Sequence, residues 1–185
     1  HPYFITACLH GSLSASGLAK IARFRNELES RCRPDSLTSE EWDHQKQKLL
    51  FGFVDGLLDG DSPVRHLADS RQAQIVQNAF LHFAEVRYQL LAFVVMPSHM
   101  HWLFQPIDSW SVSAVKKSAR DDGRTKTPRE IIAHSTQSYT ATMCNRIRSA
   151  SGPYWQHESF DHWARDEAET CLLYTSDAAD DSRSG

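Results

Sequence analysis

The chain has 185 residues, of which 41% are hydrophobic and 23% are charged, and its formal net charge is −3. This composition is typical of a globular domain and excludes an intrinsically disordered chain, and the length fits one domain with its own core. No apolar run reaches the roughly 20 residues that a membrane-spanning helix needs. The four cysteines form no CxxC pair, so we expect reduced thiols in a cytoplasmic protein.

The spacing of apolar residues predicts strands that alternate with helices. Apolar positions three or four apart indicate helices, and runs rich in Val, Phe, Trp and Ile indicate strands. For the last helix, Pro128 suits the first turn, and Ile131, Ile132, Ala141 and Ile147 are the expected buried positions. In chain order the pattern predicts a strand over 3–9, helices over 18–31, 39–58 and 70–85, strands over 87–96 and 100–105, and helices over 110–120 and 128–148. This order predicts an α+β fold with an antiparallel sheet.

The strands predicted over 87–96 and 100–105 form a hairpin, and this hairpin contains the most informative motif, His99-Met100-His101. Residues i and i+2 of a strand point to the same face, so the two imidazoles should stand side by side. Imidazole is a common ligand of divalent first-row metals, which makes the pair a candidate metal site. The alternative from the motif alone is two unrelated histidines on a half-exposed strand.

Two further segments follow the histidine motif. The first contains Tyr139 and the second begins Gly152-Pro153-Tyr154-Trp155. Together with residues 95–101, and in this order, they resemble the REP-associated tyrosine transposases, a branch of the single-tyrosine transposases with a His-hydrophobic-His motif. The resemblance extends from Tyr3 to about Glu169.

The resemblance implies a ferredoxin-like antiparallel sheet with packed helices, the His-x-His on a central strand and the tyrosine on an adjacent helix. It implies that Tyr139 is the nucleophile and that His99 and His101 hold Mg²⁺ or Mn²⁺. The activity would be metal-dependent single-strand DNA cleavage and strand transfer through a 5′-phosphotyrosine, which stores the cleavage energy for rejoining. The implied partners are single-stranded or hairpin DNA and a second copy of the chain. The resemblance implies no membrane association and places the protein at the nucleoid of a bacterial cytoplasm.

The sequence departs from the family pattern at several positions. Related enzymes have a polar metal ligand one helical turn after the tyrosine, but this chain has Met143, whose thioether does not suit a hard cation. Ser98 and Gln137 also stand where the family more often has Asn and Lys. Candidates for the missing third ligand are Asn145, Gln156 and His157.

Positive charge is concentrated between Val115 and Arg148, although the whole chain is slightly acidic. This segment has eight basic and three acidic residues, a local balance of +5. A basic segment beside a nucleophile is what a phosphate-backbone binder needs, and an ordinary solvated helix face is the alternative. The candidate DNA contacts are Lys116, Lys117, Arg146 and Arg148. The aromatic residues Tyr154, Trp155, Phe160 and Trp163 could either stack on unpaired bases or close the edge of the core.

We interpret residues 1–170 as one domain of the transposase endonuclease type, and expect it to be incomplete at both ends. Residues 171–185 read like a translated sequencing adaptor rather than native protein; the alternative is a genuine acidic, disordered tail. Two other functions stay open: a decayed DNA-binding relative whose metal site is broken at Met143, and an unrelated His-x-His metal hydrolase in which Tyr139 is only structural.

Overall fold

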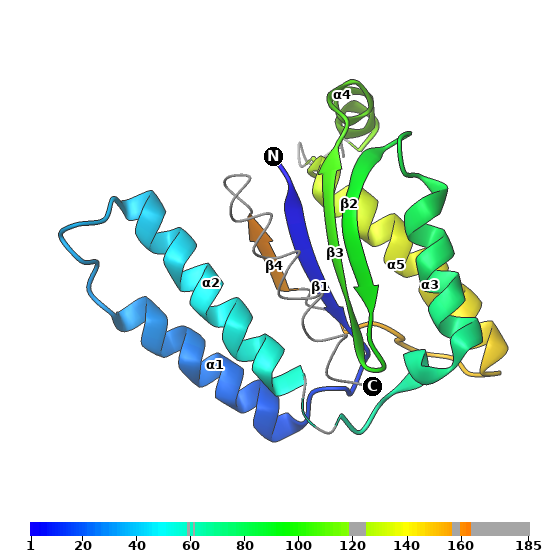
Figure 1. Cartoon of the computed structure of the whole chain (residues 1–185), viewed down its shortest axis with the longest axis horizontal. Helices are drawn as coiled ribbons and strands as arrows, with labels where there is room; N and C mark the ends of the chain where they lie inside the picture. Colours follow the sequence, from blue (N-terminus) through cyan, green and yellow to red (C-terminus); the bar gives the residue numbers. More distant parts are fainter. Residues whose placement is uncertain (59, 61, 119–124, 157–159, 164–185) are drawn as a thin grey trace.

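The computed structural model describes residues 1–58, 60, 62–118, 125–156 and 160–163. Its centre is a four-stranded sheet with the order β2-β3-β1-β4, in which all neighbours are antiparallel. The strands are β1 (Tyr3–Cys8), β2 (Tyr88–Val95), β3 (His99–Pro106) and β4 (Phe160–Trp163). The predicted α+β fold with an antiparallel sheet is therefore confirmed (Figure 1).

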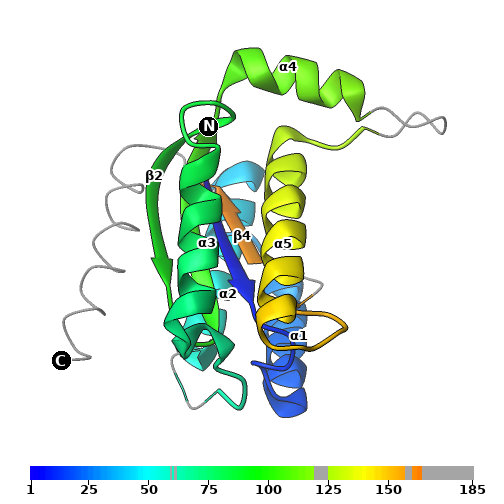
Figure 2. The ribbon, with the colours of Figure 1, turned by 90° about the vertical axis from the view of Figure 1, so that its right-hand side faces the viewer.

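Helices cover both faces of this sheet (Figures 1 and 2). The helices are α1 (Ala15–Ser30), α2 (Ser39–Leu58), α3 (Ser70–His82), α4 (Asp108–Lys117) and α5 (Pro128–Ile147), and a short 3₁₀ helix, η1 (His66–Ala68), precedes α3. The antiparallel pair α1–α2 lies on one face, α3 and α5 lie on the other, and α4 lies beyond one end of the sheet. None of the described helices is long and apolar enough to cross a bilayer.

The larger core lies between the sheet and the pair α3–α5. Met100, Trp102 and Phe104 alternate along β3 and pack in one buried cluster with Phe80 of α3 and Ile132 of α5. Alternation in a strand directs these three side chains to one face, which leaves the other face to His99, His101 and Leu103. Removing a buried aromatic side chain such as Trp102 should cost about 3–5 kcal/mol, so this cluster fixes the strand on which the histidines stand.

Helix α5 packs against the sheet through a stripe of mostly small side chains. Thr136, Thr140 and Cys144 follow Ile132 at intervals of four, and all four residues are buried. Of the expected buried positions, only Ile132 is confirmed. Ile131 and Ala141 are half-buried and Ile147 is 36% exposed, because the polar threonines face the sheet instead. Thr140 is satisfied there, since its hydroxyl oxygen accepts a hydrogen bond from the Trp155 indole at 2.9 Å.

A smaller cluster holds the α1–α2 pair against the opposite face. It consists of Cys8, Leu13, Ile21, Val54 and Leu58. The first of these is on β1, and Val54 and Leu58 are one turn apart on α2. This cluster orients the C-terminal part of α2 toward the centre of the sheet.

The segment after α5 returns to the end of β1. Leu9 and Trp155 form a β-bridge, the His10 amide donates to the Tyr154 carbonyl at 2.8 Å, and the Gln156 amide donates to the Cys8 carbonyl at 2.8 Å. Tyr154 and Trp155 are 2% and 7% exposed, so these two aromatic side chains close the core rather than offer rings to bases.

Candidate metal centre

His99 and His101 lie on one face of the central strand β3, as the alternation of the motif predicted. Their ring centroids are 4.9 Å apart, and the residues are 1% and 2% exposed. On the neighbouring strand, Cys8 pairs with His99 and Thr6 pairs with His101. The imidazole pair therefore lies at the start of β3, one of the two central strands, and faces helix α2.

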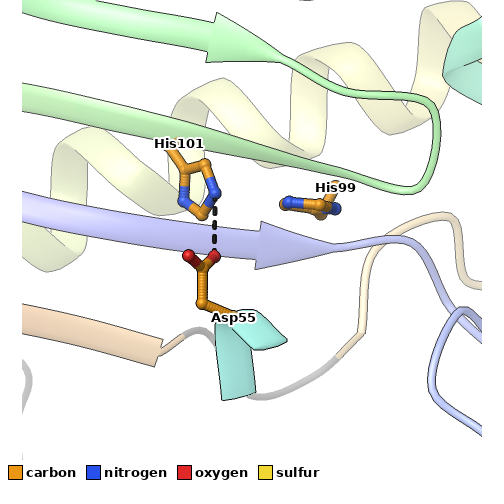
Figure 3. Close-up of side chains that lie close together, drawn as sticks. All are labelled: Asp55, His99 and His101. Carbon is orange, nitrogen blue, oxygen red and sulfur yellow. Dashed lines mark ion pairs between the residues drawn. The ribbon is translucent and has the colours of Figure 1, made fainter. Parts of the chain in front are cut away.

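The third member of the site is Asp55, which α2 supplies (Figure 3). Its Oδ1 lies 3.2 Å from Nε2 of His101. One ligand atom from each of Asp55, His99 and His101 can be chosen so that all three atoms lie within 4.8 Å of one another. Burial of Val54 and Leu58 on the same part of α2 fixes the helix so that the Asp55 carboxylate reaches the histidines.

Hydroxyl groups hold the ring nitrogens that point away from this cluster. Thr6 Oγ1 lies 2.8 Å from Nδ1 of His101, and Ser98 Oγ lies 2.9 Å from Nδ1 of His99. When Nδ1–H of each ring donates to its hydroxyl oxygen, Nε2 carries the lone pair that a metal requires. Such outer hydrogen bonds orient metal-binding histidines and set their tautomer. Ser98 thus holds the His99 ring through its hydroxyl group.

Two polar atoms of the site are buried without a hydrogen-bond partner among the described residues: His99 Nε2 and Asp55 Oδ1. The Asp55 oxygen is close to His101 but lacks hydrogen-bond geometry with it. Burial, with a smaller effect of the neighbouring His101, lowers the pKa of His99 to about 3, so this imidazole is neutral at physiological pH. Unsatisfied buried polar atoms are costly, and a shared cation would satisfy both. The residues therefore fit a metal ion.

The donor set limits which cation fits. Two imidazoles and one carboxylate occur in catalytic zinc sites and in sites for manganese or iron, which leave positions open for substrate. Imidazole suits first-row transition metals better than Mg²⁺, which prefers oxygen ligands. Cys8 lies on the same face, but burial raises the pKa of its thiol to about 12, so it packs there as a neutral side chain.

Tyr139 does not face this cluster. It lies on α5, which packs against the opposite face of the sheet, and there it lines a groove between α3 and α5. The resemblance predicts a nucleophile beside the metal ligands, and within one chain this placement is wrong. The physical reason is that the buried stripe of α5, led by Thr136 and Thr140, turns Tyr139 outward, and the residue is 54% exposed.

Of the other candidate ligands, Asn145 lies away from the cluster. Asn145 lies on α5; its amide donates to the Gly152 carbonyl at 2.9 Å, and its oxygen accepts from Arg148 at 3.3 Å. Met143 is on the same helix, so the site does not depend on it. Gln156 follows the bridge to β1, and His157 lies outside the described residues, as does the tail 171–185.

The four basic candidates divide into two groups. Lys116 and Lys117 form the end of α4, beside the start of α5, whereas Arg146 and Arg148 are at the far end of α5 (Figure 2). A helix rises about 1.5 Å per residue, so α5 keeps the two groups roughly 30 Å apart. For this reason Lys116 and Lys117 do not form one continuous positive surface with Arg146 and Arg148.

Neither a scan against protein-family models nor a search of curated proteins finds a match to this chain. The structure shows a buried cluster of Asp55, His99 and His101 that is suited to a metal. The sequence interpretation missed Asp55. One sequence signal could have identified Asp55 as a site residue. It is a single carboxylate between two buried apolar positions, Val54 and Leu58, near the end of an otherwise amphipathic helix.

Proposed function

We propose that Asp55, His99 and His101 bind a divalent first-row cation, and that this centre cleaves the phosphodiester backbone of single-stranded or hairpin DNA. The observation that carries the metal site is the convergence of the three ligand atoms within 4.8 Å in a buried position. A divalent cation bound there would polarise the scissile phosphate and stabilise the leaving oxygen.

The topology agrees with the resemblance from which we take the DNA substrate. The strand order β2-β3-β1-β4, with one packed helix preceding β2 and another following β3, is that of a ferredoxin-like sheet. The histidines stand on its central strand β3. This arrangement agrees with the resemblance to the REP-associated tyrosine transposases, and we take the DNA substrate from that resemblance together with the metal site.

The position of Tyr139 divides the proposal into two chemical variants. In a single chain the sheet separates Tyr139 from the metal ligands, so the attacking group there would be water and the product a hydrolysed strand. A phosphotyrosine intermediate, and with it strand transfer, requires Tyr139 from a second copy of the chain. Because Tyr139 is 54% exposed, its side chain can be presented to a partner. The hydrolytic variant is favoured by the opposite placement of Tyr139 and His101.

Substrate access requires helix α2 to move. The Phe51 ring of α2 lies 6.1 Å from the His101 ring, and the Phe4 ring, which packs edge-to-face against Phe51 at 5.0 Å, stacks on the His101 ring at 5.3 Å. A phosphate group cannot reach imidazoles that are only 1–2% exposed while α2 stays in place. We therefore propose that cleavage includes an opening of the α1–α2 pair.

A denaturing gel with end-labelled hairpin DNA and Mn²⁺ tests the proposal. Cleavage that is lost in Asp55→Asn and His101→Gln supports the metal centre. A covalent protein–DNA adduct that disappears in Tyr139→Phe supports the tyrosine from a second copy, and cleavage that persists in Tyr139→Phe without an adduct supports hydrolysis. Binding of the hairpin without cleavage under Mn²⁺, Mg²⁺, Zn²⁺ or Co²⁺ would contradict the proposal and favour a non-catalytic binding domain.

A further inference from the structure

A second concave site lies on the face of the sheet opposite the metal centre. It is a groove of about 550 Å³ between α3 and α5, and this volume is within the range of small-molecule pockets. Residues from both helices and Arg87 line it: Asn78, Ala79, His82, Phe83, Arg87, Ser135, Thr136 and Tyr139. Among the described residues that line the groove there is no carboxylate, so its polar groups are suited to a neutral or anionic ligand.

Arg87 is the positive group of the groove. Its guanidinium carbon lies 3.3 Å from the centroid of the Phe83 ring and 5.8 Å from that of Trp110, and one nitrogen donates to the Ser135 hydroxyl at 3.3 Å. Within the described ranges no carboxylate pairs with it. Partial burial lowers its pKa from the usual value, although an arginine stays charged. A guanidinium has five N–H donors, so most of these stay available to a ligand.

Tyr139 supplies an aromatic surface at the same groove. It is 54% exposed although it lies on a helix whose other face is buried. Aromatic faces stack on nucleobases without sequence preference, and arginine forks match phosphate oxygens. A cation fixed by Phe83 and Ser135 next to an exposed tyrosine ring therefore offers both interactions that one nucleotide requires.

We propose that the α3–α5 groove binds a nucleotide, with its phosphate on Arg87 and its base against Tyr139. A nucleotide within a single strand and a free mononucleotide share this chemistry. The site is separate from the metal centre. In it, Tyr139 would act through its ring, which stacks on the base, rather than through its hydroxyl. This inference goes beyond the cleavage activity and does not depend on it.

Fluorescence anisotropy of a labelled oligothymidylate tests the site, in the presence of EDTA so that the metal centre takes no part. The probe has roughly 12 nucleotides, which is within the usual footprint of single-strand binding modules. A matching abasic strand tests the contribution of the base, and competition by free thymidine monophosphate separates a mononucleotide from a strand. The variants are Arg87→Ala, Tyr139→Ala and Tyr139→Phe. The matched charge control is Arg31→Ala, an exposed arginine paired with Glu27 on α1.

We expect Tyr139→Ala to weaken binding roughly 5- to 150-fold, which corresponds to the loss of one stacked base, and Tyr139→Phe to bind like the wild type. Arg87→Ala should weaken binding at least about tenfold, because a hydrogen-bonded charge is lost, and should lower the salt-dependence slope by about 0.7. Wild-type affinity in both alanine variants would overturn the proposal, as would equal binding of the abasic strand or an equal loss in Arg31→Ala. Melting curves identify any variant that is unfolded. Because Tyr139 is exposed, Tyr139→Ala keeps the test decisive if Arg87→Ala does not fold.

Discussion

Oδ1 of Asp55 lies 3.2 Å from Nε2 of His101, and yet no hydrogen bond joins the two atoms. A ring nitrogen of His99 completes the cluster, in which one ligand atom from each of the three residues lies within 4.8 Å of the other two. The contact also ties two layers of the molecule together, since Asp55 belongs to α2 and His101 to β3. A cation in this cluster would join the helix to the strand, and several measurements follow from that geometry.

Metal binding should raise the stability of the folded chain. At a free metal concentration one hundred times the Kd, linkage predicts a gain of about 2.7 kcal/mol in the free energy of unfolding. We expect Asp55→Asn to remove most of this gain, as measured by thermal unfolding with Mn²⁺ or Zn²⁺ and after EDTA. Asp43→Asn is the matched control, because Asp43 is an exposed carboxylate on the same helix that pairs with Lys46. Equal stabilisation of both variants by metal would show that Asp55 is not a ligand.

The two hydroxyl groups behind the histidines should affect metal affinity without touching the metal. Thr6→Val and Ser98→Ala each remove the partner of an Nδ1 atom. Loss of such an outer partner costs 10- to 100-fold in metal affinity in typical sites, and we expect an effect of about that size. Isothermal titration with Mn²⁺ or Zn²⁺ measures it. Thr142→Val on the exposed side of α5 should leave the affinity unchanged.

Metal should also slow the opening of α2. Counting only the described residues, the α1–α2 pair is held by a small cluster of five buried residues, whereas the α3–α5 side contributes to a cluster of fourteen. Segments with few buried contacts open at low free energy, so amides of α2 should exchange faster than those of α3. Hydrogen exchange followed by mass spectrometry should show added protection of α2 when Mn²⁺ binds. Exchange of α2 that does not respond to the cation would contradict the link between Asp55 and β3.

Replacing glycine by alanine at two different positions should change the stability of the chain in opposite directions. Gly52 lies inside α2, where an added Cβ would meet no atom within 4 Å, whereas Gly152 has a φ of +97° after α5. Gly52→Ala should therefore stabilise the chain by about 0.5–1 kcal/mol, and Gly152→Ala should destabilise it by about 1 kcal/mol or more. Urea unfolding at constant m-value measures both. A loss of stability in Gly52→Ala would indicate that α2 is not a regular helix at this point.

If the chain binds DNA as proposed, its two basic groups should act independently. Lys116 lies in the last turn of α4 and Arg146 in the last turn of α5, too far apart to share one phosphate, and each is replaced by alanine in turn. Each should lower affinity for all sequences alike and reduce the salt slope by about 0.7–0.9. Their effects should add within about 0.3–0.5 kcal/mol, because distant sites do not couple. Strong non-additivity in anisotropy titrations would show that both groups contact one short stretch of DNA.

The histidine pair could be predicted from sequence because strand alternation is a local rule, and the start of α5 at Pro128 could be predicted because helix capping is local. The Thr127 hydroxyl accepts from the Glu130 amide, and the Glu130 carboxylate accepts from the Thr127 amide, which completes a capping box. Asp55 and the orientation of Tyr139 depend instead on which face of the sheet each helix covers. Local patterns do not determine this, since β3 presents Trp102 to one side and His101 to the other and both are buried.

The position of β1 between β3 and β4 has a kinetic consequence. Thr6 meets His101 from a point 95 positions away in the sequence, and its other neighbour, Phe160, comes later still. Strand β1 therefore pairs only after both β3 and β4 have reached it, and helices can form long before the sheet is complete. Folds dominated by such distant pairings fold more slowly than helical bundles of equal stability. The histidine-bearing strand gains its supporting neighbour only in that late closure, so competence to bind metal should appear with the slowest folding phase rather than with the early rise in helix content.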